Sequence, residues 1–104
     1  MTAFKAIPLT SFDASKLSNE YLAINLNGLP NSCTMIRIIN TSNVPVTISY
    51  DGITDNDVVI NSLQIQAKEV GMFSQRTNLI PAGSKFFIKG TPGVGTIYLA
   101  GYYD

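Results

Sequence analysis

Turn-forming residues recur at short intervals along this chain of 104 residues, and the stretches between them are rich in β-branched and aromatic side chains. Short runs of this kind, bounded by Gly, Pro, Asn, Asp and Ser, are typical of strands joined by tight connections. A sustained helical repeat of apolar residues is missing, which excludes a helical bundle. The pattern predicts an all-β fold, either an antiparallel β-sandwich or a jelly roll of about seven strands.

Alternation of apolar and polar residues locates the individual strands. The clearest is residues 35–40, where Ile36 and Ile38 point one way and Arg37 and Ile39 the other. The remaining predicted strands are residues 21–26, 46–50, 58–60, 63–65, 70–73, 85–89 and 97–103. The residues expected to face the core are Ile36, Ile38, Val46, Ile48, Phe87, Ile97 and Leu99.

The segment GTPGVG, residues 90–95, has the glycine spacing of a phosphate-binding P-loop, but Thr96 stands where a lysine is required. A P-loop also opens a helix, whose N-terminal amides complete the anion site. Here β-favouring residues both precede and follow the glycines. We therefore predict a hairpin between the last two strands, with Pro92 and the glycines forming its turn, and exclude phosphate binding.

Composition limits the class of protein. With 45% hydrophobic residues the chain can form one domain around a single core. Seven basic and seven acidic residues cancel, so no nucleic-acid partner is expected. Only 13% of residues are charged, which favours a homo-oligomer over a monomer. The chain has neither a membrane-spanning run nor the pattern of a signal peptide, and we expect synthesis in a cytoplasm and no membrane partner.

The first residues form a segment of a different kind. Residues 1–19 carry apolar residues at no regular spacing, and we interpret them as an extended arm with a turn of helix near residues 14–17, ahead of a β-sandwich domain at residues 20–104. Burying one large apolar side chain returns roughly 1.5–3 kcal/mol, so this arm has too many for a free tail. We expect it to lie along a neighbouring copy or another protein, the alternative being its own sandwich. The apolar residues of this assembly arm are Phe4, Ile7, Leu9, Phe12 and Leu17.

Candidate chemical groups are few. Histidine and tryptophan are absent, and we predict neither catalytic residues nor a cofactor. Cys33 is the single cysteine, and we interpret it as a small buried hydrophobe. Asp51, Asp55 and Asp57 could supply oxygen ligands to Ca²⁺, but their spacing is not that of an EF-hand. We favour a solvated loop with a tight turn at Asp51 and no metal requirement.

Two further sets of residues have side chains that could form a site. Glu20 and Glu69 lie far apart in the sequence, and nothing indicates that they form an acid/base pair. The tyrosines of the last strand could stack on sugars or bases, although tyrosines at strand positions more often fill a core or an interface. These are Tyr98, Tyr102 and Tyr103.

Two long strings, MIRIINTSNVPVTISYDGITDNDVV and IPAGSKFFIKGTPGVGTIYLAGYY, resemble small virion structural proteins of tailed bacteriophages. That family shows an R-I-x-N opening, a V-T-I-S-Y/F-D-G-x-x-D centre and a closing P-x-G-x-x-x-x-x-K-G-x-x-G-x-G-x-x-Y-x-x-G-Y. The matching positions are Arg37, Ile38, Asn40, Val46 through Gly52, Asp55, Pro81, Gly83, Lys89, Gly90, Gly93, Gly95, Tyr98, Gly101 and Tyr102.

The resemblance implies a non-enzymatic structural component of a virion, with a capsid decoration or cement protein in many copies as the first expectation. A neck or tail adaptor is the alternative position on the particle. A glycan-binding module for host recognition is a further alternative. The implied partners are the major capsid protein or neck and tail proteins, together with other copies of the chain. No catalytic residues are carried over from the family.

Overall fold

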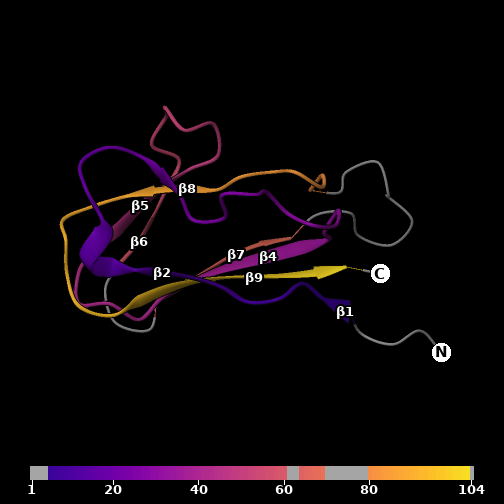
Figure 1. Ribbon diagram of the computed structural model, residues 1–104, viewed down its shortest axis with the longest axis horizontal. Helices are drawn as coiled ribbons and strands as arrows, with labels where there is room; N and C mark the ends of the chain where they lie inside the picture. Colours follow the sequence, from indigo (N-terminus) through magenta and orange to yellow (C-terminus); the bar gives the residue numbers. More distant parts are fainter. Residues whose placement is uncertain (1–4, 61–63, 70–79, 104) are drawn as a thin grey trace.

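The computed structural model describes residues 5–60, 64–69 and 80–103, which form two antiparallel sheets over a shared core (Figure 1). The predicted all-β class is confirmed. The strands are β1 (Lys5–Ala6), β2 (Thr10–Asp13), β3 (Leu22–Ala23), β4 (Met35–Asn40), β5 (Val46–Ser49), β6 (Asp57–Val59), β7 (Gln64–Glu69), β8 (Phe87–Lys89) and β9 (Thr96–Tyr103). The one helical turn is the 3₁₀ segment η1 (Ala14–Lys16), within the predicted range.

Each sheet combines strands from separate parts of the chain. Sheet A has the order β1-β9-β4-β7, with β2 also paired to β9, and sheet B has the order β3-β8-β5-β6. In sheet A the central strand β4 pairs with β9 along its whole length, from Met35 opposite Tyr102 to Asn40 opposite Ile97. The two sheets lie one above the other in Figure 1, and the chain passes between them several times.

The core follows from strand alternation. Ile36 and Ile38 of β4 lie inward beside Ile97 and Leu99 of β9, because successive strand residues point to opposite faces. The inward positions of sheet B are equally apolar, and the core residues from the two sheets form one cluster. The predicted inward residues that are fully buried are Ile36, Ile38, Val46, Ile48, Ile97 and Leu99.

Phe87 was predicted to face the core, and that prediction is wrong. It is half-buried, and its ring lies on the outer side of sheet B, against Gly52. Phe86 fills the core instead, making an edge-to-face contact with Tyr50 at 5.9 Å between ring centroids. Two adjacent phenylalanines can satisfy alternation in either register, and the tertiary contacts select Phe86 and Ile88 as the inward pair.

The predicted final hairpin is also wrong. β8 belongs to sheet B and β9 to sheet A, so residues 90–95 cross between the sheets and do not turn one strand back on its neighbour. The crossing runs close to residues 41–43, where a Cβ on Gly95 would lie 2.5 Å from the Cα of Ser42. Gly95 has φ 127°, which disfavours any other residue. The glycines therefore permit a close crossing of two backbones.

Two other predicted strands differ from the structure. Residues 21–26 were expected to alternate throughout, but β3 ends at Ala23 because Asn25 turns inward. The Asn25 amide donates to the carbonyl of Ser84 at 2.9 Å and accepts from the N–H of Phe86 at 2.9 Å. The piece predicted at 63–65 overlaps the longer strand β7, with Leu63 itself outside the described residues. The piece predicted at 70–73 lies entirely outside the described part of the chain.

A buried asparagine marks the place where the chain leaves sheet A for sheet B. Asn40, at the end of β4, is fully buried, and its Nδ2 donates to the carbonyl oxygens of Val44, Val59 and Ile60 at 2.8, 3.1 and 3.2 Å. Its Oδ1 accepts from the N–H and hydroxyl of Ser42 at 2.9 and 2.6 Å. One side chain thus joins the end of β4 to the chain entering β5 and leaving β6.

Candidate functional site

The structure places the predicted assembly arm on its own sheet. β1 and β2 pair antiparallel with β9, and Leu17, 2% exposed, belongs to the core. Ile7 is also buried and Phe12 packs half-buried against the core, whereas Leu9 is 61% exposed. This is the alternative raised from the sequence, in which the arm lies on its own sandwich, and in it the open edge of β9 pairs with a nearby extended segment. Phe4 lies outside the described residues.

Backbone amides of the glycine-rich loop at residues 90–95 donate hydrogen bonds to carbonyl oxygens of the arm. The N–H of Gly90 donates to the carbonyl of Ser18 at 2.8 Å, and the N–H of Gly93 donates to the carbonyl of Ala14 at 3.1 Å. Amides bonded to carbonyl oxygens cannot also surround a phosphate. The loop therefore connects the arm to the two sheets and carries no anion site.

Asp51 organises the loop between β5 and β6. Its carboxylate accepts hydrogen bonds from the N–H groups of Ile53 and Thr54, both at 2.8 Å, and from the hydroxyls of Ser49 and Thr54. These donors, the Thr54 N–H foremost, hold the pKa of Asp51 well below its usual range. Gly52, with φ 82°, completes the predicted tight turn.

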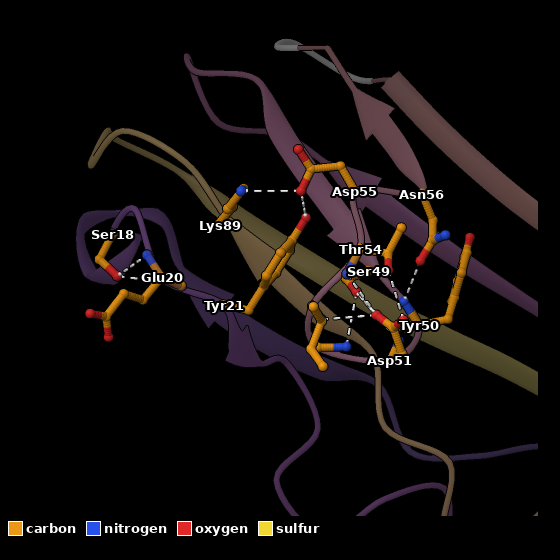
Figure 2. A network of polar contacts seen from close by, with 12 residues as sticks. Ser18, Glu20, Tyr21, Ser49, Tyr50, Asp51, Thr54, Asp55, Asn56 and Lys89 are labelled. Atoms are coloured by element: carbon orange, nitrogen blue, oxygen red, sulfur yellow. Dashed lines mark hydrogen bonds and ion pairs between the residues drawn. The ribbon is translucent and has the colours of Figure 1, made fainter.

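Asp55 joins this loop to two other parts of the chain (Figure 2). It accepts a hydrogen bond from the Tyr21 hydroxyl and forms a 3.1 Å ion pair with Lys89 of β8. The Lys89 ammonium also lies over the Tyr21 ring, 4.7 Å from its centroid. Burial, with the bond to Asp55, raises the pKa of Tyr21 to about 12, while the hydroxyl and the ammonium lower the pKa of Asp55.

Asp57 forms a hydrogen bond with the side chain of Tyr50. The Tyr50 hydroxyl is the donor, and burial together with this bond raises the pKa of Tyr50. An open hollow of about 350 Å³ lies alongside, lined by Thr47, Asp55, Asn56, Asp57 and Val58. Carboxylate, amide and hydroxyl groups therefore meet one apolar side chain at the surface of sheet B.

The three carboxylates of this loop do not converge. Asp51 faces its own loop, Asp55 faces Tyr21 and Lys89, and Asp57 faces Tyr50. Within the described residues, no three His, Cys, Asp or Glu side chains come close enough to hold a metal ion. The absence of a metal requirement remains a prediction, tested below.

Cys33 is fully buried, as predicted, and its burial raises the thiol pKa. A thiol in this state is a poor nucleophile because the reactive form is the thiolate. Glu69 lies in β7 of sheet A and Glu20 is an exposed residue ahead of β3 in sheet B. In residues 5–60, 64–69 and 80–103, no helix is long and apolar enough to cross a membrane.

The tyrosines of β9 divide between the two faces of sheet A. Tyr103 packs against the core, whereas Tyr98 and Tyr102 alternate with the buried residues of the strand and face outward. Arg37 of β4 shares that outer face, and its Nη1 donates to the Tyr102 hydroxyl at 3.3 Å. Sequence reasoning proposed an interface role for tyrosines at such positions, but it could not locate their neighbours.

The residues that carry the family resemblance contact one another across the sequence. Arg37 of the opening block bonds Tyr102 of the closing block, and Asp55 of the central block pairs with Lys89 of the closing block. Asn40 joins the opening block to the chain on either side of the central one. Sequence reasoning did not predict these contacts, because most of them join residues far apart in the chain.

Comparison with known proteins adds no relative: no family model matches the chain, and neither the curated proteins nor the solved structures contain a match.

Proposed function

We propose that this chain is a non-enzymatic structural component of a tailed-bacteriophage virion, with capsid decoration or cementing in many copies as its first position. The proposal rests on the resemblance in three sequence blocks. The observation that carries it is that these blocks, which are far apart in the sequence, contact one another through the Arg37–Tyr102 and Asp55–Lys89 pairs. Residues that bond to one another in this way are suited to a structural role, since these contacts occupy their polar groups.

The distribution of polar and apolar groups supports a contact protein. The carboxylates of Asp51, Asp55 and Asp57 and the buried amides of Asn25 and Asn40 all bond to groups of the same chain. Seven large apolar side chains of the described residues are also exposed, and they suit packing against other proteins. They are Leu9, Leu22, Leu26, Ile53, Val58, Ile60 and Val94.

A neck or tail adaptor would use the same kind of module at a different place on the particle. Copy number separates the two positions, because a cement protein repeats over the whole capsid surface whereas a neck component is limited to one vertex. The fold itself favours neither position.

A glycan-binding module is the second candidate function, favoured by the hollow beside Asp55, Asn56 and Asp57. Saccharide sites combine such acceptors and amides with an aromatic surface. Tyr21 lies nearby, but the Lys89 ammonium is placed over its ring. This reduces the aromatic surface available for stacking, and we rank the candidate below the structural role.

Quantitative mass spectrometry of purified particles tests the proposal. A cement protein should be present in numbers comparable to the major capsid protein, and a neck or tail adaptor in far fewer copies. Complete absence from the particle would refute a virion role. Binding of the purified chain to host-surface saccharides, lost in Asn56→Ala and retained in Asn27→Ala, would instead establish the glycan-binding candidate.

A further inference from the structure

The outer face of sheet A has an unusual composition. On β4 the outward residues are Met35, Arg37 and Ile39, and on β9 they include Tyr98 and Ala100. The register places Ile39 opposite Tyr98 and Arg37 opposite Ala100, so these side chains share one surface. An antiparallel sheet with one solvated face normally carries polar residues there. On β4 and β9 the outward residues are apolar or aromatic except for Arg37 and Thr96, and Tyr102 is the third outward aromatic or apolar residue of β9.

These residue types are those of a protein interface. Tyr, Met and Arg are enriched at protein–protein contacts, and Lys, Glu and Ser are depleted. Sheet B packs on the opposite face, and none of the described strands lies against the outer one (Figure 1). The five residues are half-buried and so retain exposed surface. The face is therefore available for packing against a second sheet.

The charges on this face are arranged for a second copy of the same chain. β2 extends the face beyond β9, with Ser11 opposite Tyr98 and Asp13, which is exposed, opposite Thr96. Arg37 and Asp13 therefore lie on either side of β9, separated by about 10 Å across the strands and about 13 Å along them. The midpoint between them falls on Tyr98.

We propose that two copies pack through this face about a twofold axis that passes at Tyr98. An axis that lies in the plane of the interface, perpendicular to the line from Arg37 to Asp13, would exchange the two charged positions, so Arg37 of each copy meets Asp13 of the other. Tyr98 would then pack against its own counterpart, with Ile39 and Ala100 around it. The inference deepens the proposed function by naming the surface through which copies meet, and it rests on that function only for its biological setting.

The size of the face predicts how tightly the copies bind. Four strands spaced as in an ordinary sheet give a contact of roughly 500 Å² per copy. A standard stable interface buries about 800 Å² per partner. We therefore expect a weak dimer in solution, which repetition on a particle would reinforce.

Sedimentation equilibrium of the full chain, from about 10 µM to about 1 mM, tests the inference. The wild type should shift from monomer to dimer over this range. Tyr98→Glu places two like charges on the axis and should raise the dissociation constant by at least about tenfold. Val58→Glu, a substitution of an exposed residue on sheet B, should leave it unchanged. A chain that stays monomeric throughout, or a dimer that Tyr98→Glu leaves intact, would overturn the proposal.

A charge exchange separates a second copy from any other partner. Arg37→Glu alone and Asp13→Arg alone should each weaken the dimer, and the double variant should restore it to within about threefold of wild type. Thermal melts check that each variant is folded. If Asp13→Arg fails to fold, a mixture of Arg37→Glu with wild type decides, since it should form fewer dimers than wild type alone. Self-association of a chain that is absent from particles would sustain this inference and refute the proposed function. A chain that is present in particles but stays monomeric in solution would refute this inference and sustain the proposed function.

Discussion

Asn40 offers the sharpest test of how the two sheets are joined. Replacing it by aspartate keeps the size and the Oδ1 acceptor for Ser42 but removes the amide donor. The carbonyl oxygens of Val59 and Ile60 then lose their bonds to this side chain. The carbonyl of Val44 keeps only a share of the single Ser42 hydroxyl proton, which lies 2.6 Å (Oγ to Oδ1) from residue 40 and 3.0 Å (Oγ to O) from Val44. Asn40 is fully buried, so water cannot substitute without rearrangement.

Each buried polar group left without its partner costs about 1–3 kcal/mol. The two carbonyl groups that lose the donor, and the carboxyl that replaces the amide, together give an expected loss of about 3–9 kcal/mol. A domain of this size has a free energy of unfolding of about 5–15 kcal/mol. Asn40→Asp should therefore unfold the protein or lower its melting temperature by at least about 10 °C.

Urea titration and thermal melts followed by circular dichroism measure the effect. Asn27→Asp is the matched control, because Asn27 is exposed and the same chemical change there should alter stability by less than about 0.5 kcal/mol. If Asn40→Asp melts within a few degrees of Asn27→Asp, the argument that Asn40 holds the sheets together is refuted.

Four further predictions concern the turns, the arm, the acid response and metal. Gly95→Ala should lower the free energy of unfolding by about 2 kcal/mol or more, because Gly95 has a positive φ and its added Cβ would clash with Ser42. Gly83→Ala should cost less, because Gly83, with φ 88°, has open space around the added Cβ. Equal urea midpoints of the two variants would contradict this. Deleting residues 2–17 should abolish cooperative unfolding, because the arm supplies buried core residues; a truncated chain with a wild-type melt would show that the arm is dispensable. The pKa of Asp51 is lower in the folded than in the unfolded chain, so its stabilisation is present above about pH 4 and is lost as the pH falls further. The melting temperature of Asp51→Asn should accordingly fall less steeply below pH 4 than that of wild type. A chelator should leave the melting temperature unchanged, and a drop of many degrees would return the aspartates to consideration as ligands.

Local patterns were sufficient for the elements in which one face is buried. The alternation at residues 35–40 predicted β4 and its inward residues Ile36 and Ile38, and the Asp51–Gly52 pair predicted the turn after β5. Cys33 was correctly expected to be buried. These outcomes depend on neighbours within a few residues, where side-chain period and turn chemistry act directly.

Tertiary structure decided which strands became neighbours. β8 and β9 follow one another closely, yet they lie in different sheets, and the arm was drawn into sheet A by the edge of β9. The Tyr21, Asp55 and Lys89 cluster and the shared face of Arg37 and Tyr98 likewise join residues far apart in sequence. Alternation specifies which side of a strand is buried but carries no information on which strand lies beside it, because backbone hydrogen bonds are the same for every pair. The partner is chosen by how all the apolar faces are buried together.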